Sequence, residues 1–359
     1  MGMHGGNLKE AQERYRLKKE EIIDFSANIN PLGFPGSTGK IISSHLDDIA
    51  HYPDPDCKDL KEALTRRLNT NADNLLIGNG SMELIFLLAL ALKPKKALIP
   101  SPAFTEYERG VRLSGGRCLF LKTREDNNFE IKVAEITRHL SSVDSVFICN
   151  PNNPTGFLFD REKIRFLAQR CEKKGVLLVI DEVFMDFVEK KGELSMASLA
   201  PAKRHLLVLH SLTKFFAFAG LRLGYLIGNK KLLKGIACYQ PPWSVNALAQ
   251  LVGCAAVKDT LYFRKSREYV FRERDVLCRE LREIRFLKTY PATANFIFCK
   301  LKSQKMSSRK LCDYCASRGI LIRDCSNFRG LDNRFIRLAV RKREENRKLI
   351  NILREAIPT

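Results

Sequence analysis

A lysine and an aspartate each follow a short apolar run in the middle of the sequence. Lys214 comes after the run Leu206–Leu209, and Asp181 follows the run Val176–Ile180. A lysine amine becomes a nucleophile when burial or a neighbouring cation removes its proton. Each residue alone has an ordinary interpretation, because a lysine at a strand end is usually a surface charge and an aspartate there usually caps a turn. Together they offer a reactive amine and a carboxylate to one ligand.

A second set of polar residues is suited to binding a phosphate. The segment Gly80–Met82 opens a helix, and the free amides at a helix N-terminus bind anions. Ser211 and Thr213 add hydroxyl groups, and Arg222 adds a guanidinium. A glycine-rich turn before a helix is by itself typical of plain helix initiation. Four such groups in one set nevertheless indicate that they bind one anion together.

These two sets together predict a pyridoxal phosphate (PLP) site. PLP requires a lysine for its Schiff base and an acidic partner for its ring nitrogen, because the protonated ring acts as an electron sink. In such a site Asn153 would donate to the phenolic oxygen of the ring, and Phe104 would stack on the ring face. Outside such a site, Asn153 in Asn-Asn-Pro-Thr-Gly is typical of a turn and Phe104 of a core.

Short apolar runs alternate with helical segments through the central part of the chain. The expected strands are Lys96–Ile99, Ser145–Cys149, Val176–Ile180 and Leu206–Leu209, and the expected helices are Met82–Leu92, Arg161–Lys174 and Lys230–Ala237. This alternation predicts an α/β fold with a largely parallel sheet covered on both faces. Ligands of open α/β sheets bind beyond the carboxyl ends of the strands. The polar residues named above follow those ends.

The sequence changes in character after about residue 245, where long helices precede two further strand-like runs. These runs are Asn295–Leu301 and Phe335–Val340, with the helical stretch Leu311–Arg318 between them. They predict a smaller α+β domain. We expect an N-terminal segment at residues 1–45 associated with that domain and the active site, a large PLP-binding domain at 46–250, and the small domain at 251–359.

Composition narrows the class of protein. A chain of 359 residues with 45% hydrophobic content can bury a sizeable core. No apolar run reaches the roughly 18–20 residues that span a bilayer, and the opening residues lack the regions of a signal peptide, so we expect a cytoplasmic protein.

The 11 scattered cysteines fit reduced thiols. Cys312 and Cys315 form a C-x-x-C without a second pair, so no metal site is expected.

The formal net charge of +21 raises nucleic acid binding as an alternative function. The charge is diffuse, however. Its densest stretches, Arg264–Arg285 and Arg341–Arg347, mix basic residues with glutamates and apolar residues at helical spacing, as solvated helix faces do. A basic surface also attracts a phosphorylated small molecule, and no nucleic acid partner is expected.

The order of these motifs resembles the fold-type-I PLP enzymes close to histidinol-phosphate aminotransferase. The resemblance rests on Asn-Pro-Thr-Gly, Asp181, Ser211-Leu-Thr-Lys214 and Gly220-Leu-Arg222-Leu-Gly-Tyr225. The chain ends are more similar to the threonine-phosphate decarboxylases of cobalamin biosynthesis, through His4-Gly-Gly-Asn7, Asp24-Phe-Ser-Ala-Asn-Ile-Asn-Pro-Leu-Gly33, Tyr52-Pro-Asp-Pro-Asp, Pro242-Trp-Ser-Val-Asn-Ala-Leu-Ala249 and Ile322-Arg-Asp-Cys-Ser326. This fold type implies a mostly parallel, seven-stranded-type sheet between helices.

The resemblance implies a role for each matching residue. Lys214 would form the Schiff base, Asp181 would meet the ring nitrogen, and Asn153 the ring oxygen. The cofactor phosphate would meet Gly80, Ser81, the Met82 amide, Ser211, Thr213 and Arg222. Tyr52 matches a tyrosine that reaches the phosphate in the neighbouring subunit, so a homodimer is implied. The substrate would be held by His4, Gly5, Asn28, Asn153, Arg323 and Arg337.

The two arginines also have a physical rationale, because forked guanidinium groups bind carboxylates and phosphates bidentately. Each arginine taken alone fits a solvated surface charge equally well. Phe184 replaces a tyrosine that many of the aminotransferases carry, which favours the decarboxylase. We therefore expect decarboxylation of L-threonine O-phosphate. The alternatives are transamination of histidinol phosphate or a related amino acid, L-serine O-phosphate as the substrate, and a basic binding protein without catalysis.

Overall fold

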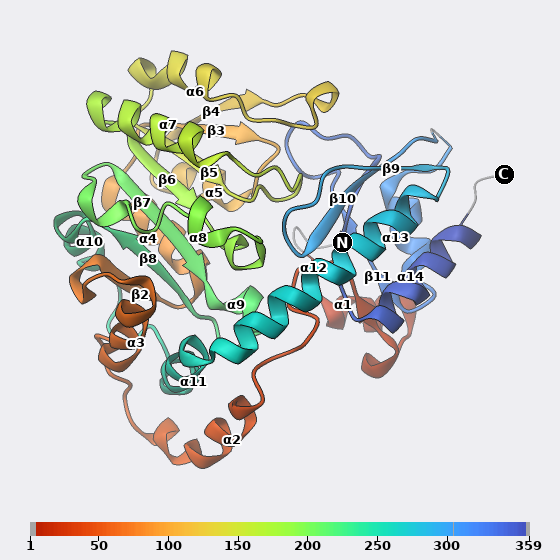
Figure 1. Cartoon of the computed structure of the whole chain (residues 1–359), viewed down its shortest axis with the longest axis horizontal. Coiled ribbons are helices and arrows are strands. Elements are labelled where there is room, and N and C mark those ends of the chain that lie inside the picture. The colour runs from red at the N-terminus through yellow and green to blue at the C-terminus, as the bar shows by residue number, and fades with distance from the viewer. Residues whose placement is uncertain (1–4, 304, 357–359) are drawn as a thin grey trace.

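The computed structural model describes residues 5–303 and 305–356. A seven-stranded sheet with the order β2-β8-β7-β6-β5-β3-β4 forms its larger half (Figure 1). Its strands are β2 Leu75–Gly78, β3 Lys96–Ser101, β4 Arg117–Lys122, β5 Ser145–Cys149, β6 Leu177–Asp181, β7 Leu206–Ser211 and β8 Gly224–Gly228. Strands β3 to β7 run parallel, whereas β8 is antiparallel to both of its neighbours. The predicted α/β fold is confirmed.

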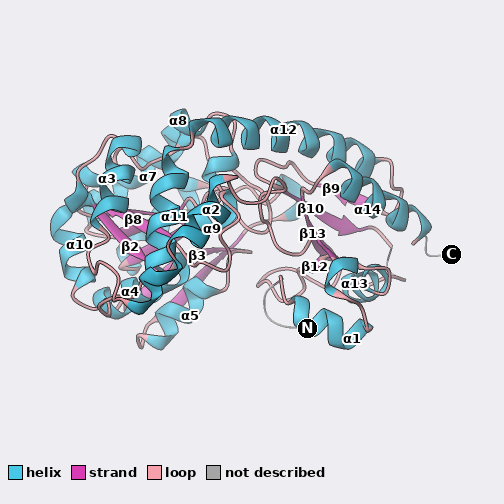
Figure 2. Cartoon of the chain, turned by 90° about the horizontal axis from the view of Figure 1, so that it is seen from below, coloured by secondary structure: helices cyan, strands magenta, loops and turns pink. Residues whose placement is uncertain are grey.

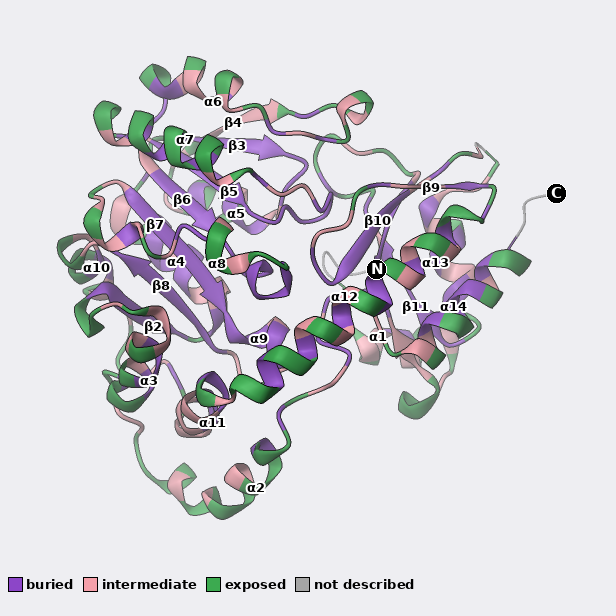
Figure 3. Ribbon diagram, viewed as in Figure 1, coloured by how far each residue is buried: buried purple, intermediate pink, exposed green. Residues whose placement is uncertain are grey.

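Side chains alternate between the two faces of this sheet, and each face has its own helices. Ile148, Ile180 and Val208 pack toward one face, while Phe147 and Val179 pack toward the other. Helices of the first face include α3 Lys58–Leu68, α6 Val133–His139, α7 Arg161–Lys174 and α11 Ala247–Lys258, and those of the second are α4 Gly80–Leu92, α5 Glu106–Leu113 and α10 Lys230–Ala237. Burial on both faces is why these strands read as continuous apolar runs (Figure 3).

A four-stranded antiparallel sheet with the order β12-β13-β10-β9 forms the smaller half. Its strands are β9 Leu287–Thr289, β10 Phe296–Leu301, β12 Arg323–Asp324 and β13 Phe335–Ala339, and its helices are α13 Ser308–Ala316 and α14 Arg343–Glu355. The N-terminal segment joins this half, because β1 Ile23–Asp24 pairs with β11 Ile320–Leu321. Helix α1 Leu8–Tyr15 lies beside α13 (Figure 2).

One long helix connects the two halves. Helix α12, Thr260–Arg282, packs Tyr262 and Phe263 into the large core and Leu277 and Leu281 into the small core (Figure 1). The expected boundary after residue 250 falls inside α11, which packs against α3 in the large half.

The remaining helices are short or lie at the edge of the molecule. They are α2 Ser37–Ser44, α8 Lys191–Leu194 and α9 Leu212–Phe215. No helix within the described ranges is long and apolar enough to cross a membrane.

Candidate active site

A cavity of about 350 Å³ lies where the carboxyl ends of the parallel strands face the small sheet. Of the residues predicted from the sequence, twelve line it. They are Gly5, Asn28, Ser81, Met82, Phe104, Asn153, Asp181, Thr213, Lys214, Arg222, Arg323 and Arg337. These residues come from both halves of the fold, so the cavity exists only when the two halves are assembled.

Lys214 enters the cavity from α9, the short helix that follows β7. Ser211 begins this helix by accepting a hydrogen bond from the Thr213 amide, and the Lys214 carbonyl accepts one from Asn30 at 3.0 Å. Burial lowers the pKa of the Lys214 amine to about 8, and the charges of Arg337 and Arg222 act in the same direction. The uncharged, nucleophilic form of this amine is therefore reached at a lower pH than for an exposed lysine.

Asp181 ends β6 at the floor of the cavity and is almost fully buried. One carboxylate oxygen accepts a hydrogen bond from the Tyr107 hydroxyl at 2.5 Å, and the other accepts one from the Val183 amide at 2.9 Å. Burial raises the pKa of the Asp181 carboxyl to about 6, while these two hydrogen bonds and His210 oppose the rise. The carboxylate is therefore fixed in direction and ready to pair with a buried cation.

An anion cradle lies at the N-terminus of α4. Gly80 has a φ of +78°, and a Cβ added there would lie 2.7 Å from a terminal nitrogen of Arg222. Only glycine therefore leaves room for the guanidinium beside the helix N-terminus. The hydroxyls of Ser211 and Thr213 lie 2.6 Å apart at the same end of the cavity. Arg222 makes no ion pair with any described residue, although it donates to the Ala219 carbonyl, so its charge is available to a ligand.

Arg337 lies beneath Asn153 and is fully buried. Its guanidinium donates to the side-chain oxygen of Asn153 and, at 2.8 Å, to the Ser26 carbonyl. Because the Asn153 oxygen is taken, its amide N–H groups remain to donate into the cavity. Burial lowers the pKa of Arg337 to about 10, and the neighbouring Arg323 contributes to this.

Arg323 and Arg337 are direct cross-strand partners on β12 and β13. Arg323 donates to Asn327 at 2.8 Å and lies 5.3 Å from the ring centre of Phe328. Opposite residues of neighbouring strands project from the same face of a sheet. The two guanidinium groups therefore lie on the same face of the small sheet, and both line the cavity.

Four of the predicted residues do not line this cavity. Gly80 and Ser211 lie just behind its wall, where they shape the anion cradle. Tyr52 is 81% exposed and stacks on Trp243 with ring centres 4.5 Å apart. His4 lies outside the described residues.

The structure also brings to the site residues that sequence reasoning did not assign to it, among them Ala27, Cys149 and Val183. Ser26 and Phe328 line the cavity, and Tyr107 holds Asp181 from below. Tyr107 lies in the first turn of α5, three residues after Phe104, which precedes that helix. Ser26 lies within the motif Asp24–Gly33 but was given no role there, and Phe328 carried no signal because phenylalanine is common in cores.

The groups of the cavity match PLP one by one. The cradle beside Gly80 suits a phosphate, Lys214 offers an amine to the aldehyde, and Asp181 offers a carboxylate to the ring nitrogen. Both amide atoms of Asn28 are buried without a partner in the described ranges, as expected of a side chain that meets a ligand. Fold and site together define a PLP-dependent enzyme.

The chain belongs to the aminotransferase class I and II family, whose model matches residues 20–353. It is 36% identical over 359 residues to the threonine-phosphate decarboxylase of Salmonella typhimurium, an alignment that covers 99% of this chain and 96% of that protein. It is also similar to two solved structures. The histidinol-phosphate aminotransferase of Clostridium acetobutylicum matches with a TM-score of 0.87 and 34% identity over 93% of this chain and 98% of that one. The L-threonine-O-3-phosphate decarboxylase of Porphyromonas gingivalis matches with a TM-score of 0.83 and 27% identity over 93% and 99%.

Proposed function

We propose that this protein is a PLP-dependent carboxy-lyase that converts L-threonine O-phosphate to (R)-1-aminopropan-2-yl phosphate and carbon dioxide. The observation that carries this proposal is the receptor formed by Arg323 and Arg337, which faces the cavity that holds Lys214. A phosphorylated amino acid has two acidic groups on a short backbone, and each matches one guanidinium. Full-length similarity to threonine-phosphate decarboxylases supports the choice of substrate and a place in cobalamin biosynthesis.

The residues of this chain divide the chemistry among them. When bound, PLP supplies an electron sink for the bond broken at the α-carbon. Asp181 holds the proton on the ring nitrogen, and Asn153 donates to the ring oxygen. The two arginines orient the substrate so that the carboxylate bond, and not the Cα–H bond, is aligned for cleavage. The Lys214 amine would hold the cofactor, and Lys214 or a water would return a proton to the α-carbon.

The competing function is transamination of histidinol phosphate, since a solved histidinol-phosphate aminotransferase is 34% identical to this chain. Purified protein incubated with L-threonine O-phosphate and no keto acid is expected to release carbon dioxide and aminopropanol phosphate. Turnover only with histidinol phosphate and 2-oxoglutarate would replace the decarboxylase with the aminotransferase. L-serine O-phosphate belongs in the same panel, because one methyl group separates the two substrates by only about 1–3 kcal/mol.

We propose further that the active form is a homodimer in which Tyr52 reaches the phosphate site of the neighbouring subunit. Tyr52 and Trp243 form an exposed stacked pair, and the apolar side chains of Phe34, Leu46 and Ile49 are also exposed. Large exposed apolar side chains mark interaction surfaces. Pairing of two such surfaces would place Tyr52 beyond its own subunit.

Mixing two inactive variants tests this arrangement. We expect subunits carrying Tyr52→Ala, unfolded and refolded together with subunits carrying Lys214→Ala, to recover activity, because each mixed dimer has one site with both residues. Statistical mixing of a two-fold dimer would return about a quarter of the wild-type activity. Activity no higher than the average of the two separate variants would show that Tyr52 does not act across subunits.

A cytoplasmic location is proposed on a separate ground. All eleven cysteines are free thiols, and seven of them are buried. Reduced cysteines in this number are typical of proteins from a reducing compartment.

A further inference from the structure

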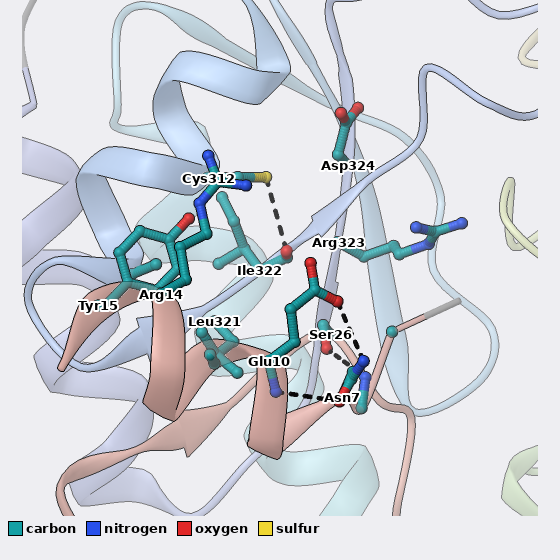
Figure 4. A pocket seen from close by; sticks show the side chains of 14 residues that line it. Asn7, Glu10, Arg14, Tyr15, Ser26, Cys312, Leu321, Ile322, Arg323 and Asp324 are labelled. Atoms are coloured by element: carbon teal, nitrogen blue, oxygen red, sulfur yellow. Dashed lines mark hydrogen bonds between the residues drawn. The ribbon is translucent and has the colours of Figure 1, made fainter. Parts of the chain in front are cut away.

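Ser26 lies in the wall between the active-site cavity and a second, smaller cavity. The second cavity, of about 60 Å³, lies beneath α1 and beside α13 (Figure 4). Gly5, Ser26 and Arg323 line both cavities, so these residues form the partition between them. Gly5 begins the stretch of residues 5–15 in the N-terminal segment, so the start of this stretch forms part of the active-site wall.

The side chain of Ser26 holds this segment in place. Its hydroxyl accepts a hydrogen bond from the Gly6 amide at 2.8 Å and donates one to Asp24 at 2.6 Å. Asp24 also accepts from the Ser26 amide at 2.7 Å, which fixes the orientation of the serine. A Cβ added to Gly5 would lie 2.4 Å from the Ser26 carbonyl oxygen, so the two backbones are in close contact.

The backbone of Ser26 faces the substrate receptor. Its carbonyl accepts the hydrogen bond from Arg337, and Arg337 in turn holds Asn153. One residue thus touches the N-terminal segment through its hydroxyl and the buried arginine through its carbonyl.

Within the described residues, α1 is also attached to the small half through its apolar side chains and through Arg14, which pairs with Asp313. Ala11 is the one buried residue of α1, in a small cluster with Ala316 and Leu321. At the far end of the helix, Tyr15 donates to Asp313 at 2.5 Å. At the end of this stretch nearest the active site, the Ser26 hydroxyl holds the Gly6 amide.

We propose that Ser26 is a positioning residue that docks residues 5–15 of the N-terminal segment over the substrate end of the cavity. The inference rests on the proposed function, because it concerns the end of the cavity that receives the acidic substrate. Docking excludes water from Arg323 and Arg337, and charge-assisted hydrogen bonds to an anion are stronger where water is excluded. Loss of docking would weaken substrate binding and leave the cofactor groups in place.

Ser26→Ala tests the proposal in the full-length holoenzyme. We expect KM for L-threonine O-phosphate to rise about tenfold, as for loss of one well-placed hydrogen bond. Amide hydrogen exchange of residues 6–15 should become faster, and the visible absorbance of bound PLP should not change. Ser43→Ala, which removes an exposed serine hydroxyl bonded within its own helix, is the matched control.

Gly5→Val supplies the second arm of the test, because its side chain would displace the segment directly. In that background Ser26→Ala should add nothing further to KM or to exchange, since two changes that break one contact are not additive. Multiplied effects, or unchanged exchange in Ser26→Ala, would overturn the proposal. If the protein does not turn over threonine phosphate, the exchange measurement still reports on docking, so the two failures are distinguishable.

Discussion

Lys214→Ala is expected to lower turnover by about 10⁴-fold, the upper range for loss of a proton-transfer group, with loss of the covalent attachment to the cofactor in addition. The variant should lose the visible absorbance that depends on the bond between lysine and PLP. Because the pKa of Lys214 is lowered to about 8, reattachment of PLP to the wild-type protein should accelerate as the pH rises through that value. Stopped-flow absorbance after mixing with PLP measures the loss of the visible absorbance in the variant and the pH dependence of PLP reattachment in the wild type.

Lys61→Ala is the matched control, because it removes a lysine that lies outside the cavity. It should keep the absorbance and the activity of the wild type. A small primary amine added to Lys214→Ala should restore part of the turnover by supplying the missing proton carrier. Substantial activity in Lys214→Ala without an added amine would contradict the role given to this lysine, and with it the assignment of the cavity.

Asp181→Asn is expected to lower kcat by about 10²–10³-fold, because a neutral amide does not hold the positive charge of a protonated ring nitrogen. Tyr107→Phe should have a smaller effect of the same kind. The Tyr107 hydroxyl stabilises the carboxylate and so lowers the pKa of Asp181, which burial raises to about 6. Removing the hydroxyl raises that pKa further, so the acid limb of the pH–rate profile should move to higher pH.

Other titratable groups also face Asp181 and Tyr107. Cys149, His210 and Glu182 also interact electrostatically with the Asp181 or Tyr107 side chain, and none of them changes in Tyr107→Phe. Tyr239→Phe, at an exposed tyrosine, is the control and should leave the profile unchanged. A reduced kcat in Tyr107→Phe without movement of the acid limb would indicate that Tyr107 acts by packing alone.

The local elements and the cofactor groups could be predicted from the sequence because their signals are local. Arg161–Lys174 and Lys230–Ala237 begin and end as expected, since Asp160 and Asn229 cap them and their apolar residues repeat at helical spacing. Asp181 and Lys214 were expected at strand ends, and parallel strands bring their carboxyl ends to the same edge. The antiparallel strand β8 was not expected, because a short run such as Gly224–Gly228 does not reveal its direction.

The sequence by itself determined the class of this protein, namely the α/β fold and its dependence on PLP, together with the set of residues proposed to bind PLP. Only the tertiary structure decided which side chains support that set. Tyr107 and Asp181 are 74 residues apart, and Ser26 and Arg337 are 311 apart, yet each pair is joined by a hydrogen bond. Such contacts depend on how distant elements pack, and no periodicity or spacing records that packing. The paired arrangement of Arg323 and Arg337, on which the proposed choice of substrate rests, likewise follows from the register of two short strands.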